Sequence, residues 1–143
     1  MQVVDCGRLE EKEQVTSRAA DWFEQAVRDL EQAEASRRDG RHESACFAAE
    51  QAAEQAVKAV HLSLAQDAGG HVVARLLSEL PVDVPTDLVE KAKVLDGFYI
   101  PTRYAGSHAE GPPFEHFGVL HSDEALRYAR EIIEFARPYV AAA

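Results

Sequence analysis

The segment RYAGSH holds the two residues best suited to chemistry, Arg103 and His108, which lie five positions apart. A guanidinium stays protonated at ordinary pH and can stabilise the negative charge of a phosphorane-like transition state. A nearby histidine can carry a proton at neutral pH. Together the two could cleave RNA without a metal, with the 2′-hydroxyl as internal nucleophile. In the alternative interpretation, Arg103 caps a helix end or pairs with an acid such as Glu54, and His108 is a solvated loop residue.

The other polar residues of this region do not form a metal-binding pattern. Its three histidines are separated by eight and five residues, a spacing that matches no compact zinc signature, and no cysteine joins them. Hydrogen bonding within a loop is therefore the favoured role for these histidines. The sequence also contains no Gly-x-Ser-x-Gly elbow and no phosphate-cradling glycine motif, so it predicts neither a metal nor a cofactor. The potential ligands considered are His108, Glu110, Glu115, His116 and His121.

Four aromatic residues surround Arg103, namely Tyr99, Tyr104, Phe114 and Phe117. Aromatic side chains can stack on the bases of single-stranded nucleic acid. Aromatics in a long loop more often anchor that loop to the rest of the domain, and we retain this as the alternative. The loop that carries these residues, Pro101 to His121, is about 20 residues long, and loops of that length are usually functional or disordered.

Helical periodicity flanks this loop on both sides, and no stretch shows the alternation of a strand. Small residues predominate on the inner face of the second helix, which would let a neighbouring backbone approach closely. The sequence predicts an all-α antiparallel bundle of four main helices and one short one, spanning residues 16–143 after a flexible lead-in, 1–15. The expected elements are a helix from Thr16 or Ser17 to a stop at Gly40, a second from Glu43 to Ala65 ended by Gly69 and Gly70, a short third from His71 to Leu80, a fourth capped by Thr86 and terminated by Pro101, and a last one from Ser122 to Pro138.

Composition limits the classes of protein that the sequence can encode. The chain has 143 residues, which suits one domain, and 15 Lys and Arg against 25 Asp and Glu give a net charge of −10. So acidic a protein is poorly suited to bind duplex nucleic acid through a broad basic face. A local cationic site is still compatible with this net charge. No apolar run approaches the ~20 residues of a membrane span, and the N-terminus lacks a secretory signal. The cysteines, Cys6 and Cys46, resemble free thiols of a reducing compartment, so we expect a cytoplasmic protein that does not associate with membranes.

The order of these segments resembles the HEPN domain (higher eukaryotes and prokaryotes nucleotide-binding), particularly its short bacterial and archaeal single-domain members. The resemblance covers roughly residues 17–140. Its most specific parts are ACFAAEQAAEQAVKA, from Ala45 to Ala59, and YIPTRY, from Tyr99 to Tyr104. It implies an antiparallel helical bundle that usually dimerises, with an R-x4-6-H motif near the dimer cleft.

The resemblance also implies which residues act. Arg103 and His108 match the two motif positions and are the expected catalytic pair, while Glu54 and Lys58 match polar positions that recur on the second helix of this subgroup. With Tyr99 and Tyr104 they are the expected binding residues. In relatives that are silenced by AMP transfer, a tyrosine follows two positions after the motif histidine; this chain has a glutamate there, so that form of control is not predicted.

Three functions are compatible with this resemblance. Many family members are metal-independent endoribonucleases that act as toxins, so the first is an RNA- or nucleotide-binding toxin-like protein with a site in a homodimer cleft. The second is a non-catalytic helical partner of a minimal nucleotidyltransferase, because such enzymes are commonly encoded beside short members of the family. The third is a module that binds small nucleotides without catalysis.

Overall fold

The computed structural model describes residues 6–67 and 69–142, with side chains from Arg18 onward, and within these ranges the chain is helical with no strand. The expected all-α architecture of four main helices and one short one is therefore confirmed. The elements are α1 (Cys6–Arg38), α2 (His42–Ser63), α3 (Val73–Ser78), α4 (Thr86–Asp96), the 3₁₀ turns η1 (Ala105–Ser107) and η2 (Pro113–His116), and α5 (Val119–Ala141).

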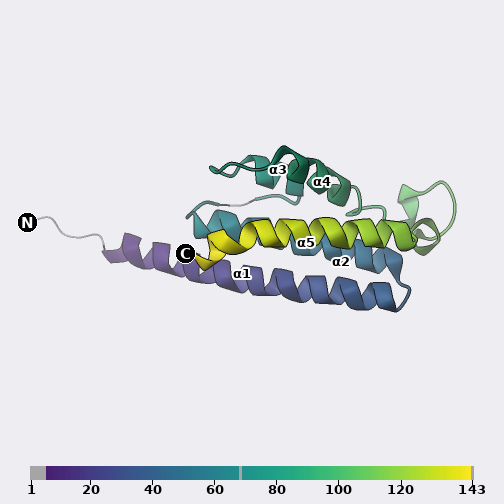
Figure 1. The fold of residues 1–143 in the computed structure, drawn as a ribbon, viewed down its shortest axis with the longest axis horizontal. Helices are drawn as coiled ribbons and strands as arrows, with labels where there is room; N and C mark the ends of the chain where they lie inside the picture. Colours follow the sequence, from purple (N-terminus) through teal and green to yellow (C-terminus); the bar gives the residue numbers. More distant parts are fainter. Residues whose placement is uncertain (1–5, 68, 143) are drawn as a thin grey trace, which may run out of the picture.

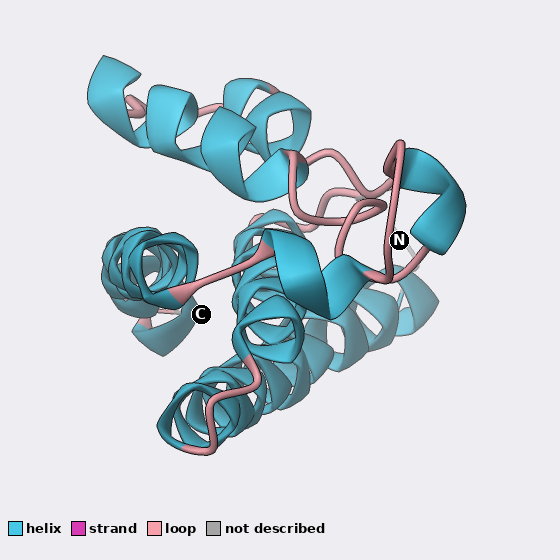
Figure 2. Ribbon diagram, turned by 90° about the vertical axis from the view of Figure 1, so that its right-hand side faces the viewer, coloured by secondary structure: helices cyan, strands magenta, loops and turns pink. Residues whose placement is uncertain are grey.

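The three longest helices form one bundle, and the two shorter ones lie across it. α1 and α2 form an antiparallel hairpin that reverses at Gly40, whose φ of 75° suits glycine. α5 runs beside α2 in the same direction, because α3 and α4 carry the chain back to the end of the bundle where α2 begins (Figure 1). Seen along the bundle, α3 and α4 form a second layer above α2 and α5 (Figure 2).

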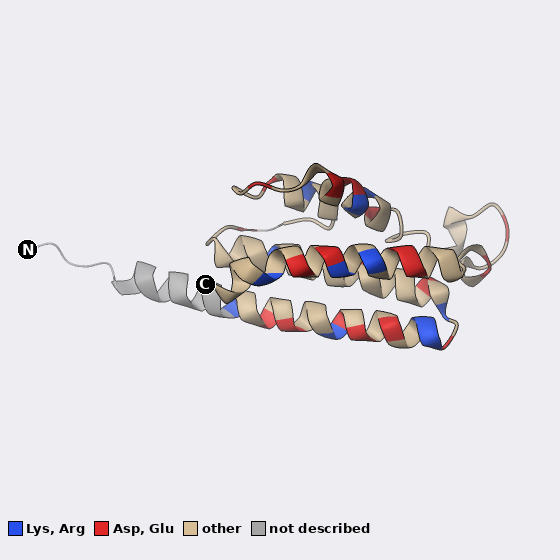
Figure 3. Cartoon of the chain, in the orientation of Figure 1, with Lys and Arg blue, Asp and Glu red and all other residues tan. Residues whose placement is uncertain are grey.

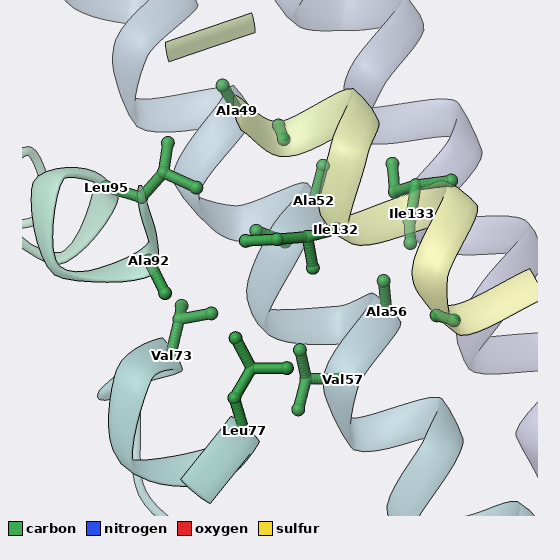
Figure 4. Close-up of a cluster of buried hydrophobic side chains, with 14 of the residues drawn as sticks. Ala49, Ala52, Ala56, Val57, Val73, Leu77, Ala92, Leu95, Ile132 and Ile133 are labelled. Atoms are coloured by element: carbon green, nitrogen blue, oxygen red, sulfur yellow. The ribbon is translucent and has the colours of Figure 1, made fainter. Parts of the chain in front are cut away.

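Alanines on α2 let the helices approach closely. Ala49, Ala52 and Ala56 are fully buried, and the two isoleucines of α5, Ile132 and Ile133, pack beside them (Figure 4). Side chains of α3 and α4 close the core from the second layer. Burial of each large aliphatic side chain stabilises the fold by about 1.5–3 kcal/mol relative to exposure. Charged residues lie along the outer faces of α1 and α5 (Figure 3).

The first helix begins earlier than the sequence pattern suggested. α1 starts at Cys6, not at Thr16 or Ser17, so much of the expected lead-in is helical. The physical reason is that residues 8–15, RLEEKEQV, are mostly strong helix formers without glycine or proline. Residues 1–5 of the expected lead-in lie outside the described residues.

Residues that were expected to end or cap helices behave differently at several places, and α4 ends at Asp96, ahead of Pro101, which was expected to terminate it. α2 ends at Ser63, and Ala65 supplies the left-handed residue (φ 56°) of the reversal, ahead of the two glycines that were expected to end it. Thr86 is the first residue of α4 and its side chain makes no capping bond. α5 starts at Val119 and continues through Pro138. Pro138 lies in the last turn, where its missing N–H removes a single bond.

The segment between α4 and α5 is held by a few buried contacts. Phe98 is buried, and its ring meets that of Phe117 edge-on at a centroid separation of 6.0 Å. The hydroxyl of Thr102 donates to the backbone oxygen of Phe98. Phe117 therefore anchors the loop, as the alternative interpretation proposed, whereas Tyr104 and Phe114 stay exposed.

Candidate functional site

Arg103 presents a free guanidinium. Its Cζ lies 4.4 Å from the ring centroid of Phe47 on α2, and the side chain is exposed. Among the described residues no carboxylate lies within ion-pair distance of Arg103, and no helix end accepts a hydrogen bond from it. The alternative in which Arg103 pairs with Glu54 is therefore wrong, because Glu54 has other partners. A cation above an aromatic face keeps its hydrogen-bond donors available for a ligand.

A groove between α1 and α2 opens beside Arg103. Its volume is about 600 Å³, and most of its wall is made of amide and hydroxyl side chains. Asp29, the acid in this wall, accepts hydrogen bonds from two glutamines, and Arg41 is paired with Asp39 at 2.7 Å. Arg103 therefore contributes the cation that no described carboxylate neutralises. The lining residues are Gln25, Asp29, Gln32, Ser36, Arg41, Ser44, Phe47, Ala48, Gln51, Gln55 and Arg103.

His108 lies on the same loop as Arg103 but does not line this groove. Its Nε2 donates a hydrogen bond to the backbone oxygen of Pro101 at 2.6 Å, and its ring stacks on that of His116 at 4.0 Å. A carbonyl oxygen only accepts, so the proton sits on Nε2 and Nδ1 is the basic nitrogen of the neutral ring. The structure thus fixes a tautomer suited to accept a proton, but it does not bring His108 into contact with Arg103.

The remaining histidines of this region serve the loop itself. His116 Nε2 bonds to the backbone oxygen of Glu110, and His121 Nδ1 accepts from the backbone N–H of Gly118 at the start of α5. Hydrogen bonding was the favoured interpretation for these residues, and these contacts confirm it. In the part of the chain that the structure describes, no group of histidine, cysteine and acidic side chains is arranged to hold a metal.

Glu54 and Lys58 form a buried ion pair on α2. Lys58 Nζ lies 3.4 Å from one carboxylate oxygen of Glu54, and His71 Nδ1 lies 3.1 Å from the other. The side chains of Glu54 and Lys58 are 6% and 11% exposed, whereas that of His71 is 64% exposed. Lys58 also lies over the ring of Trp22 on α1. Glu54 therefore holds an accessible imidazole by Nδ1, and Nε2 of His71 makes no described hydrogen bond.

Planar side chains connect Arg103 to this ion pair. Tyr99 stacks on Phe47 at a centroid separation of 6.0 Å and on His71 at 5.7 Å, with an interplanar angle of only 10° in the second case. We call Arg103, Phe47, Tyr99 and His71 the stacked row. Of the two tyrosines expected to bind, Tyr99 belongs to this row; Tyr104, beside Arg103 in sequence, is 59% exposed and lies outside it.

Glu50 is a buried acid beneath this region. It is fully buried, one carboxylate oxygen accepts from Gln51 Nε2 at 2.7 Å, and the other has no described partner. Burial raises the pKa of Glu50 to about 8, so the group is mostly protonated at neutral pH. Sequence reasoning missed Glu50, Phe47 and His71. A signal was present for Glu50, because a charged residue occurs at a core-facing position of an alanine-rich helix.

Comparisons with known proteins agree with this architecture. The HEPN domain family model matches residues 19–139. The structure is similar to that of TT1696 from Thermus thermophilus, with 50% identity, a TM-score of 0.84, and coverage of 85% of this chain and 98% of that one. It also resembles ST0689, an archaeal HEPN homologue (34% identity, TM-score 0.75, 85% and 97% covered). An HEPN domain protein from Thermotoga maritima matches at 28% identity and a TM-score of 0.69, with 86% and 99% covered. No curated protein matches the chain.

Proposed function

Because the chain belongs to the HEPN domain family, we propose that it binds RNA or nucleotide phosphate at Arg103 and acts as a metal-independent endoribonuclease of a toxin–antitoxin module. The observation that carries this proposal is the free guanidinium of Arg103 at the wall of the groove. In a chain with a net charge of −10, Arg103 places one positive charge at the groove that no described carboxylate neutralises. A small cationic site suits one or a few phosphates, whereas a broad duplex needs many cations.

The proposed cleavage uses the 2′-hydroxyl of the RNA. His108 Nδ1 takes the proton of that hydroxyl, the 2′-oxygen forms a bond to phosphorus, and the bond from phosphorus to the 5′-oxygen breaks. The departing 5′-oxygen takes a proton from water, and the hydroxide so formed takes the proton back from the His108 imidazolium, which leaves a 2′,3′-cyclic phosphate, a 5′-hydroxyl and the neutral imidazole. Arg103 donates to the non-bridging oxygens, on which charge increases in the transition state. Tyr99 and Tyr104 are the further residues of the proposed binding site, and Glu54 and Lys58 belong to it as the buried ion pair that holds His71.

Two copies of the chain complete the site in this proposal. HEPN domains commonly dimerise, and His108 does not line the groove of its own copy. A cleft between two copies would let one RNA strand reach Arg103 and His108 together. Light scattering of the purified protein tests this step, and a monomer at micromolar concentration would contradict it.

RNA cleavage in EDTA tests the catalytic proposal. Single-stranded and structured RNAs are incubated with the wild type, Arg103→Ala, His108→Ala and, as a matched control on α5, Arg127→Ala. We expect fragments that end in a cyclic phosphate, about 10²-fold or greater loss with Arg103→Ala and His108→Ala, and no loss with the control. Equal cleavage by all four proteins, or none by the wild type, would refute the ribonuclease proposal.

A second candidate function is that of a non-catalytic partner of a minimal nucleotidyltransferase. A specific observation favours a protein contact at this end of the molecule. Large apolar side chains are exposed near the start of α5, with Phe114 at 61%, Val119 at 57% and Leu120 at 83%. This function predicts co-purification with the nucleotidyltransferase, loss of the complex with Leu120→Asp, and no RNA cleavage in the assay above.

For the described residues, no helix has the length and apolar character needed to cross a bilayer.

A further inference from the structure

The stacked row connects two separate hollows on the surface. Arg103 and Phe47 line the groove of about 600 Å³ at one end. At the other end His71 lines a smaller hollow of about 270 Å³, together with Gly70 and Arg75. Tyr99 lies between the two ends and stacks on both neighbours.

Each hollow holds an arginine. Arg103 has no described ion-pair partner, whereas Arg75, whose side chain is 79% exposed, is paired through Nε with Glu79, which lines the same hollow. The terminal nitrogens of Arg75 make no described hydrogen bond. A ligand with repeating phosphates and planar groups between them would match two cations separated by a row of planar side chains.

We propose that a single strand of RNA bound at Arg103 continues along the stacked row into the second hollow, so that His71 contacts a nucleotide beyond the first while Tyr99, packed between Phe47 and His71, holds the row in place. This inference rests on the proposed function, because it extends the same binding site. A single strand exposes the faces of its bases for stacking, whereas a duplex buries them. The net charge of −10 opposes a broad duplex contact in any case.

The ion pair beneath His71 explains how that residue would act. Glu54 accepts from Nδ1 and is itself held by Lys58, so the imidazole has a fixed orientation. Its Nε2 then makes a hydrogen bond to a base or phosphate without first ordering the ring, which reduces the entropic cost of binding. His71 is a binding residue in this inference, and Glu54 positions it.

The length dependence of RNA affinity tests the inference. Labelled 2′-O-methyl oligouridines of two and eight nucleotides cannot be cleaved by attack of the 2′-oxygen, and their binding is followed by fluorescence anisotropy. The variants are Arg103→Ala, His71→Ala and Tyr99→Leu. The matched control is Tyr139→Leu, which removes a half-buried aromatic ring in the last turn of α5. Thermal melts confirm that each variant is folded, and His71 is exposed enough for its removal to leave the core intact.

We expect the wild type to bind the longer strand more tightly than the shorter one. His71→Ala and Tyr99→Leu should each weaken binding of the longer strand by roughly five- to tenfold and change that of the shorter strand by less than twofold. Arg103→Ala should weaken both. If the His71 and Tyr99 variants bind both strands as the wild type does while Arg103→Ala weakens both, the inference is wrong and the proposed function stands. If Arg103→Ala binds both strands normally, the proposed function is wrong and the inference fails with it.

Discussion

Glu50→Gln should make the protein more stable, and increasingly so as the pH rises. The pKa of Glu50 is about 8 in the folded protein, against its usual value of 4.5, because burial disfavours the charged form. Between these values the unfolded chain releases the proton while the folded chain keeps it. The free energy of unfolding of the wild type therefore falls by about 1.4 kcal/mol per pH unit through this group. The stabilising contribution is complete below pH 4.5 and is lost as the pH approaches 8.

Glutamine has nearly the same shape as glutamic acid and does not titrate. The difference in free energy of unfolding between Glu50→Gln and the wild type should accordingly grow by about 2–3 kcal/mol from pH 5.5 to pH 7.5. Urea denaturation at three pH values and one protein concentration measures this difference. Glu24→Gln, at an exposed position on α1, is the control. Its free energy of unfolding should differ from that of the wild type by the same amount at all three pH values. A difference for Glu50→Gln that does not change with pH would show that Glu50 is ionised in the folded protein.

Three further predictions concern groups near the same core. Lys58→Met should destabilise the protein by about 3 kcal/mol in urea denaturation, because it leaves the buried carboxylate of Glu54 with only His71; adding Glu54→Leu should recover part of that loss. Asp96→Ala should cost about 1–2 kcal/mol, measured in the same way, because the carboxylate of Asp96 accepts from two backbone N–H groups at the start of α3. Burial raises the pKa of the Cys46 thiol to about 12, so in a Cys6→Ser background a thiol reagent should label it only as fast as the protein unfolds.

The helical fold could be predicted from sequence because its signals are local. The alanine face of α2 and the glycine at the reversal after α1 both occur where periodicity and turn chemistry place them. Helix ends were less predictable because long-range packing overrides local stop signals. α5 continues through Pro138 while Tyr139 and Val140 pack against the core. The chain turns at Ala65, and α3 begins at Val73 and not at His71 as expected. His71 therefore lies before the helix, where its side chain reaches Glu54.

The site was predicted only in part, because most of its contacts join distant segments. Arg103 was identified from its residue type and motif, and its exposure fits that expectation. Its contact with Phe47, however, spans more than fifty positions of sequence, and the imidazole that Glu54 orients is that of His71. Periodicity cannot show such pairs. The roles of Arg103 and His108 in catalysis stay predictions.

The polar residues of α2 are the strongest argument that this face has a role beyond packing. Glu50, Glu54 and Lys58 occupy buried positions on a helix whose other buried residues are largely alanine and valine. Apolar residues of similar volume at these positions would often be equally or more stable, because burial of a charge carries a large desolvation penalty. The ion pair of Glu54 and Lys58 instead orients His71. Glu50, the neutral acid, lies one turn before Glu54 on α2. A helix selected only for stability would have no reason to keep this arrangement, whereas a binding surface that needs a fixed imidazole beside stacked rings would.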